Sequence, residues 1–385
     1  MDTPFIYNRY TTGKFFVGRK NECSILTNLL KKNENVVLYS PPKTGKMSVI
    51  QQTLYNMRSG GHRFRIAHAR MFNIESVNSF ATKFGEAVIR ACGNSPADYK
   101  NIISTYLADT HFIFDEDRYS AQDEALSLNW DADQNDMLTI FALPERIAED
   151  RGEQVITIIE DVDQLLNLKE LEYEAVLKNI NTILTANKEK EAKHSCIIFT
   201  GSHVNGMKHI FEYKKYLRRL VEHLPLAEVD DRDIIEHLVK GFLTSGKVID
   251  RDLALGASKL FKEHLWYINH FASICDSMTK GYINEGILMQ ALNAMLAIHQ
   301  PYFITLMNDL TGHQKSLLKA VLDGVVKFSA TEIIEKYALN SSANVKRVKD
   351  ALTKKEIITF NEKDEPIILD PLFEYWLRNH FYEKR

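Results

Sequence analysis

The segment NVVLYSPPKTGKMSVIQQ, residues 35–52, joins an apolar run to an amphipathic pattern through a short loop. The run Val36–Tyr39 predicts a buried strand, and the pattern over Lys46–Arg58 predicts a helix. A P-loop has the form G-x-x-x-x-G-K-[ST] between a strand and a helix, because its backbone N–H groups and its lysine surround phosphates. The segment therefore predicts a phosphate-binding loop, with the register Ser40-Pro41-Pro42-Lys43-Thr44-Gly45-Lys46-Met47.

Two positions of this loop depart from the pattern. Gly45 and Lys46 are in place, and the amino end of the following helix adds partial positive charge. Ser40 replaces the first glycine, and Met47 replaces the Ser or Thr that ligates Mg²⁺. Ser48 comes one residue late, so its hydroxyl points about 100° further around the helix. We therefore expect ATP to bind with weakened Mg²⁺ coordination. The candidate nucleotide-binding residues here are Ser40, Pro41, Lys43, Thr44, Gly45, Lys46, Met47 and Ser48.

The composition is that of a globular protein with more than one domain. The chain has 385 residues, 45% of them hydrophobic, which suggests two or three domains. Its formal net charge of -3 gives no overall attraction to nucleic acid or to anionic membranes. The four cysteines are isolated, and neither a signal peptide nor a membrane span is apparent. We expect a cytoplasmic protein without a membrane partner.

The first half of the chain alternates strands and helices. Further strands are predicted at Phe64–Ala69, Val155–Ile159 and Cys196–Thr200, which indicates an α/β core with a parallel sheet. The predicted strand Val155–Ile159 is followed by Glu160 and Asp161. Acids at this place are typical of a Walker B segment, in which they hold Mg²⁺ and polarise water. Thr200 ends the fourth strand, and the carboxyl ends of parallel strands face the ligand crevice.

An acidic segment from 109 to 136 interrupts this alternation. It has one basic residue, Arg118, and the alternating sequence ALSLNW within it predicts a strand of a hairpin. The segment is interpreted either as a solvated excursion or as an insertion that binds an unknown protein partner. Its nine acids are Asp109, Asp115, Glu116, Asp117, Asp123, Glu124, Asp131, Asp133 and Asp136.

Helical patterns dominate from about residue 230. We expect a core at 1–229, a helical lid at 230–300 and a third domain at 301–385. In the third domain three helices precede a hairpin, the order of a winged helix-turn-helix, with a capping box at Ser329–Glu332 opening the second helix. Lys346, Arg347 and Lys349 make one helix basic, but the hairpin turn NEKDEP is acidic. The domain therefore predicts at most weak DNA binding, with protein contact as the alternative.

Several motifs together resemble the archaeal-type ATPases of the STAND branch of P-loop NTPases, which are close to AAA+ proteins. The resemblance rests on FFVGRKNE, the P-loop, IIED, IIFTGS, YLRRLVEHLPL and IILDPLFEYWLR, in the family's order and over nearly the whole chain. It implies that Phe16, Gly18 and Arg19 lie near the adenine pocket and that Thr200 belongs to a sensor strand. It also implies that Arg218 senses or stabilises the γ-phosphate.

The chain departs from this family at several points. Glu160 and Asp161 stand in the reverse of the usual Asp-Glu order, Leu217 replaces a glycine before Arg218, and the lid's Gly-x-Pro is missing. The resemblance implies an ATP- and ADP-binding switch with slow or regulated hydrolysis, Glu160 holding the metal and Asp161 the water. The alternative is a nucleotide-dead scaffold that binds protein or DNA. A replication-initiator-like DNA loader shares the architecture, but a more basic C-terminal domain would be expected for it.

Overall fold

The computed structural model describes residues 4–214 and 216–382, which form parts of two compact units. The sheet unit contains residues 20–40 and 52–226. The described residues of the helical unit are 4–19, 41–51 and 227–382, so most of the predicted phosphate-binding loop is grouped with it. Each unit is described by itself below.

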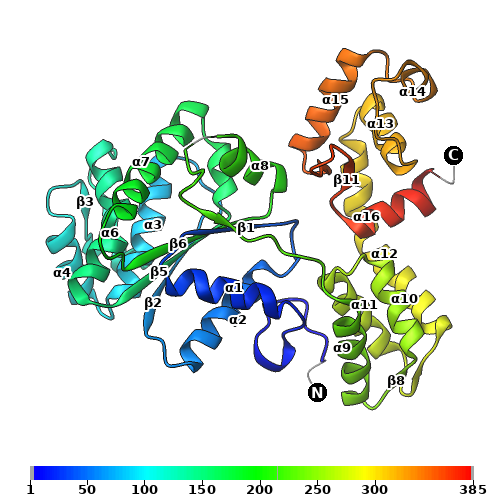
Figure 1. Ribbon diagram of the computed structural model, residues 1–385, viewed down its shortest axis with the longest axis horizontal. Helices are drawn as coiled ribbons and strands as arrows, with labels where there is room; N and C mark the ends of the chain where they lie inside the picture. Colours follow the sequence, from blue (N-terminus) through cyan, green and yellow to red (C-terminus); the bar gives the residue numbers. More distant parts are fainter. Residues whose placement is uncertain (1–3, 215, 383–385) are drawn as a thin grey trace. The chain divides into compact units, whose positions relative to one another are not determined.

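The sheet unit is built on five parallel strands in the order β2-β5-β6-β1-β7 (Figure 1). All residues of β1 and β6 are buried, because helices cover both faces of the sheet and leave no polar side to these strands. Four strands match the predicted ones to within a residue at each end, while β7 was not predicted. The strands are β1 Val36–Tyr39, β2 Phe64–Arg70, β5 Gln154–Glu160, β6 Ser195–Gly201 and β7 Glu222–His223.

The helices of this unit follow the strands in the chain. Helices α3, α6 and α7 pack against one another, and the Ser76 side chain caps α3. The acidic segment contains β3 Phe112–Ile113 and β4 Ser127–Leu128, an antiparallel pair that confirms the predicted hairpin strand. The helices are α1 Lys20–Lys31, α2 Lys46–Ser59 (whose first residues belong to the helical unit), α3 Val77–Cys92, α4 Pro96–Tyr106, α5 Glu116–Gln122, α6 Gln134–Arg151, η2 Val162–Asn167, α7 Glu170–Lys188, α8 Val204–Lys208 and η3 His209–Tyr213.

The helical unit begins with an N-terminal segment and continues into the lid. Phe5 is fully buried against Phe242, with ring centroids 4.6 Å apart, so the segment is part of the lid's core. A Cβ on Gly241 would lie 2.4 Å from the Phe5 ring, which explains the glycine. The elements are η1 Gly13–Phe15, α9 Asp231–Thr244, β8 Val248–Ile249, α10 Arg251–Leu260, α11 Leu265–Met278, β9 Tyr282–Ile283 and α12 Glu285–Asn308.

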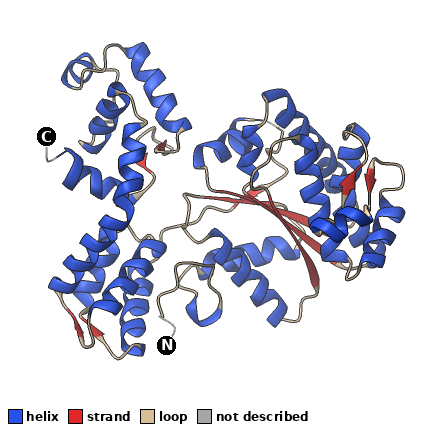
Figure 2. Ribbon diagram, turned by 180° about the vertical axis from the view of Figure 1, so that it is seen from behind, coloured by secondary structure: helices blue, strands red, loops and turns tan. Residues whose placement is uncertain are grey.

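The winged helix completes this unit, and its secondary structure is drawn in Figure 2. The predicted order of three helices and a hairpin is confirmed, but the capping box at Ser329 is wrong: Ala330 precedes α14 and no side chain caps it. The elements are α13 Gly312–Leu322, α14 Thr331–Lys336, α15 Ser342–Lys354, β10 Ile358–Phe360, β11 Pro366–Ile368, α16 Pro371–Trp376 and η4 Leu377–Tyr382.

One apolar core runs through the lid and the winged helix. It extends from Phe5 and Val229 to Leu377 without a break. Helix α12 crosses the expected boundary at 300/301 and contains Pro301, and α16 packs against it (Figure 1). Lid and winged helix are thus grouped in one compact unit, while the domain limits set from the sequence stay a prediction. In the described part of the chain, no helix is long and apolar enough to cross a membrane.

Candidate functional site

The loop between β1 and α2, the predicted phosphate cradle, turns tightly. Lys43 and Gly45 have φ angles of 64° and 95°, and Gly45 is the residue type that adopts such angles without strain. The Thr44 hydroxyl donates to the Pro41 carbonyl at 2.9 Å, and the Lys46 amine donates to the same oxygen at 3.0 Å. Lys46 opens α2 and is 8% exposed. The amine of Lys46 is thus hydrogen-bonded to a carbonyl of the loop itself. A phosphate could attract the amine away from this carbonyl.

The hydroxyl of Ser48 is bonded to the N-terminal segment. It accepts a hydrogen bond from the Thr11 backbone N–H at 3.0 Å. Met47, which precedes it, offers only a thioether, a soft donor that Mg²⁺ does not favour. Met47 thus supplies no oxygen where the pattern has the hydroxyl that ligates Mg²⁺, and the weakened Mg²⁺ coordination stays a prediction.

The FVGR motif approaches the loop inside the helical unit. Gly18 has a φ of 64°, and a Cβ there would lie 2.7 Å from Val229 Cγ1 and 3.3 Å from Asp233 Oδ2. The glycine is therefore required both by conformation and by space. A Cβ on Gly45 would lie 3.8 Å from Arg19 Nη1, which places the Arg19 guanidinium beside the loop. Phe16 lies two residues before Gly18 and is partly buried.

The carboxyl ends of β5, β6 and β1 meet at one edge of the sheet unit. Tyr39 is aligned with Gly201, and Ile159 with Phe199, so Ser40, Thr200 and Glu160 all lie at this edge. Thr200 is 1% exposed. The topology thus brings the three sequence-predicted strand ends together, as the parallel arrangement requires.

Glu160 is engaged by two side chains of β2 that sequence reasoning missed. His68 Nε2 lies 2.7 Å from Glu160 Oε2, and Arg70 Nε lies 3.3 Å from the same oxygen. A metal ion would have to compete with both groups for this oxygen. His68 and Arg70 are each about 90 residues from Glu160 in the chain. Only the register of β2 on β5 therefore reveals that they meet it. Asp161 follows with a left-handed φ of 58° at the start of η2.

A buried carboxylate on η2, which packs against β6, was also missed. The Asp163 side chain is 1% exposed, and its Oδ2 lies 2.8 Å from His203 Nδ1. Its Oδ1 has no hydrogen-bond partner among the described residues. A Cβ on Gly201 would lie 2.5 Å from that oxygen, so only glycine fits there. Asp163 therefore fixes the orientation of His203, whose side chain is 52% exposed at the carboxyl end of β6.

Arg218 lines a different part of the sheet unit. It is exposed at a cavity of about 390 Å³ beside β1 and β7. Tyr39 and His223 stack in this cavity with ring centroids 4.7 Å apart, and the Tyr39 hydroxyl donates to Glu212. Burial lowers the pKa of His223, so the imidazole there is neutral at pH 7. The role of Arg218 toward a γ-phosphate stays a prediction.

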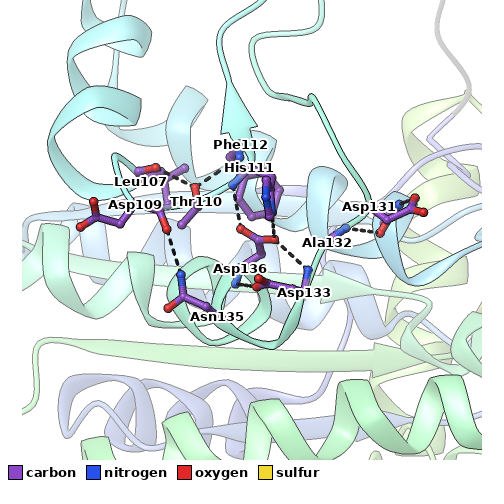
Figure 3. Close-up of polar contacts among 11 residues, drawn as sticks. Leu107, Asp109, Thr110, His111, Phe112, Asp131, Ala132, Asp133, Asn135 and Asp136 are labelled. Carbon is purple, nitrogen blue, oxygen red and sulfur yellow. Dashed lines mark hydrogen bonds and ion pairs between the residues drawn. The ribbon is translucent and has the colours of Figure 1, made fainter.

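The acidic segment contains one group with metal-binding residue types, shown in Figure 3. Ligand atoms of His111, Asp133 and Asp136 lie within 4.8 Å of one another. The Asp136 carboxylate, however, already accepts hydrogen bonds from the backbone N–H groups of Asp133 and His111, and the His111 ring lies 2.8 Å away. Burial opposes ionisation of Asp136, but these bonds outweigh it and lower its pKa. These hydrogen bonds thus cap the start of α6, and they hold the group together without an ion.

The basic helix of the winged helix is α15. Lys346 and Arg347 are exposed on it. Lys349 instead lies over the Phe360 ring of the wing, with its Nζ 4.1 Å from the centroid, and 3.8 Å from Asp364. Lys349, one of the three basic residues expected to contact DNA, is therefore held against the β10–β11 hairpin.

Comparisons with known proteins agree with this architecture. The chain is similar in structure to a Walker-type ATPase of Pyrococcus abyssi, with 15% identity and a TM-score of 0.63 over 97% of this chain and 99% of that one. It is also similar to the ORC2 protein of Aeropyrum pernix in its ADPNP–ADP complexes, with 12% identity and a TM-score of 0.58 over 99% and 98%. The chain has the fold of a P-loop ATPase.

The C-terminal part has a match of its own. Residues 301–379 match the family model described as a probable winged helix domain. A search of curated protein sequences finds no match. The predicted fold class, a parallel P-loop core with a lid and a winged helix, is therefore confirmed. At such low identities the likeness carries the fold, and the individual site residues stay predictions.

Proposed function

We propose that the chain is an ATP-binding protein of the archaeal-type ATPase kind that acts as a nucleotide-dependent switch and hydrolyses ATP slowly. The observation that carries this proposal is the loop at residues 40–46. It combines a left-handed Gly45, the buried amine of Lys46 and the start of a helix of 14 residues. Backbone N–H groups at a helix start and a nearby ammonium are the elements that bind phosphates.

The residues around the loop fit an anionic ligand. Lys46 would exchange the Pro41 carbonyl for phosphate oxygen, and Arg19 beside Gly45 adds a second cation. Ser40, Pro41, Lys43 and Thr44 shape the turn that would carry the N–H groups. The ADPNP–ADP complexes and the ADP form of the structurally similar ORC2 protein of Aeropyrum pernix support a nucleotide as the ligand.

The residues predicted to coordinate Mg²⁺ fit that role less well. Mg²⁺ would supply charge neutralisation of the phosphates when bound. Glu160 is the carboxylate available for it, but His68 and Arg70 already engage one of its oxygens. Asp161 would orient water, and Thr200 and Arg218 would sense the γ-phosphate, in the roles that the resemblance implies. Because Met47 supplies no oxygen, we propose that ATP binds with little gain from Mg²⁺.

A nucleotide-dead scaffold is the second candidate. The contacts of Lys46 with Pro41 and of Glu160 with His68 favour it, because both key groups are satisfied within the protein. Such a protein would act through its winged helix or through the acidic segment on a protein partner, and at most weakly on DNA through Lys346 and Arg347.

Calorimetry with ATP, in the presence and absence of Mg²⁺, separates the two candidates. The switch binds ATP in both conditions, and Lys46→Ala abolishes most of that binding. Equal ATP affinity in wild type and Lys46→Ala, or no binding to either, would refute the nucleotide-binding role. Release of phosphate from labelled ATP, measured on the same preparations, then reports whether bound ATP is hydrolysed.

A further inference from the structure

The first turn of lid helix α11 touches the phosphate-binding loop at two places. The Lys43 Nζ lies 3.7 Å from the centroid of the Trp266 ring, close enough for a cation–π contact. At His264, the residue just before α11, a hydrogen bond to the Pro42 backbone favours the charged form of the imidazole, although burial dominates and lowers its pKa to about 4. Lys43 also holds a left-handed φ of 64°, a conformation that a lysine does not favour by itself.

The Trp266 ring is held in place on its other sides. Tyr7 meets it edge-on, with centroids 5.7 Å apart, and His270 lies 5.2 Å away. Tyr7 and His270 in turn stack with centroids 4.4 Å apart. Burial of the Lys43 amine lowers its pKa, and the charge of Asp370 offsets part of this effect. Lys43 as a whole remains exposed, so its amine can leave the Trp266 ring for a phosphate.

The next residue of α11 faces the winged helix. The Tyr267 hydroxyl donates to Asp370 Oδ2 at 2.7 Å. The other carboxylate oxygen of Asp370 accepts the backbone N–H groups of Leu372 and Phe373 at 2.9 Å each and so caps α16. Adjacent residues of one helix therefore contact the loop on one side and the helix cap of the winged helix on the other.

We propose that Trp266 and Tyr267 are positioning residues that couple the nucleotide-binding loop to α16 of the winged helix. The proposal rests on the proposed ATP binding. Phosphate groups attract the Lys43 amine away from the Trp266 ring, which loosens the support of Trp266 and alters the neighbouring Tyr267–Asp370 hydrogen bond. Coupling between two sites is reciprocal. If ATP changes the affinity for a partner that binds at the cap of α16, that partner therefore changes the ATP affinity by the same factor.

Tryptophan fluorescence tests the first contact directly. The chain has three tryptophans, so Trp130→Phe with Trp376→Phe leaves Trp266 as the only indole emitter. We expect ATP to change this emission with the same saturation curve that calorimetry gives. The matched control retains only Trp130, which is 73% exposed in the acidic segment, and its emission should stay constant. Bound ATP without a change in Trp266 emission overturns the proposal.

Competition for Lys43 gives a second readout. Trp266→Leu removes the ring face that holds the amine, so ATP affinity should rise by about two- to fivefold, the range of an exposed cation–π contact. Trp266→Phe retains an aromatic face and should restore the wild-type affinity in large part. A fall in ATP affinity in both variants would show that Trp266 serves only the packing of the lid, and would overturn the proposal.

Hydrogen exchange tests the link to the winged helix. ATP should change the exchange rates of the amides of Leu372 and Phe373, and Tyr267→Phe should abolish this change while leaving ATP affinity within about twofold. Tyr282→Phe, at a tyrosine that is 75% exposed on the same unit, serves as the control. If ATP still changes the exchange rates of Leu372 and Phe373 in Tyr267→Phe, the coupling through Tyr267 is refuted, but the proposed ATP binding is not. If calorimetry finds no ATP binding to the wild type, the proposed function has failed, and the coupling fails with it.

Discussion

Substitution of Met47 by threonine should restore a dependence of ATP binding on Mg²⁺. Met47 follows Lys46 in the first turn of α2, where the P-loop pattern has the hydroxyl that ligates the metal. Its side chain is partly exposed, so the smaller threonine leaves no buried cavity. One added oxygen ligand should contribute about 1 kcal/mol, the size of a charge-assisted contact, or roughly fivefold in Kd.

The assay is calorimetry of ATP binding at fixed ionic strength, with Mg²⁺ and with chelator. Met47→Val is the matched control, because valine has the shape of threonine without the hydroxyl. We expect a gain from Mg²⁺ in Met47→Thr and little in wild type or Met47→Val. Strong Mg²⁺ dependence in the wild type, with nothing added by threonine, would refute the reasoning and show that another residue supplies the ligand, with Glu160 the first candidate despite its contact with His68.

Three further predictions concern the loop, the winged helix and the lid. Lys46→Ala should remove most ATP binding in calorimetry, since its amine is the buried cation of the loop; unchanged affinity would contradict this. DNA binding through about four exposed basic residues at and just after α15 (Lys346, Arg347, Lys354 and Lys355) should be weak, with a log–log salt slope no steeper than about -4, so a slope near -8 in fluorescence anisotropy would show a larger basic surface. Burial lowers the pKa of His264 and of His270 from 6.5 to about 4, so both are neutral in the folded state. Their unfolded forms bind protons first as the pH falls from about 6.5 to 4, which should reduce the free energy of unfolding by up to roughly 3 kcal/mol for each. Denaturation of His270→Asn across this range should show a smaller loss, and an equal loss would contradict the assignment.

The sequence by itself determined the layered architecture and the position of the loop. Runs of β-branched residues such as Val155–Ile159 are buried on both sides, so their pattern predicts parallel strands without knowledge of their neighbours. Gly45 and Lys46 were also predictable, because a phosphate cradle needs those residue types at fixed spacing within one short segment. Local chemistry of this kind is encoded over a few residues.

Only the tertiary structure decided which side chains meet. His68 reaches Glu160 because the register of β2 on β5 places it opposite Ile158, two residues before Glu160 on the same face, and no local pattern carries that register. His203 is oriented by Asp163, and Lys43 lies on Trp266, through packing between elements distant in the chain. Residues 40–46 predict a nucleotide-binding loop, but these partners decide how freely its metal ligand and its lysines can act. The physical reason is that burial and pairing depend on what each side chain faces, whereas strand and loop formation depend mainly on the residues beside it.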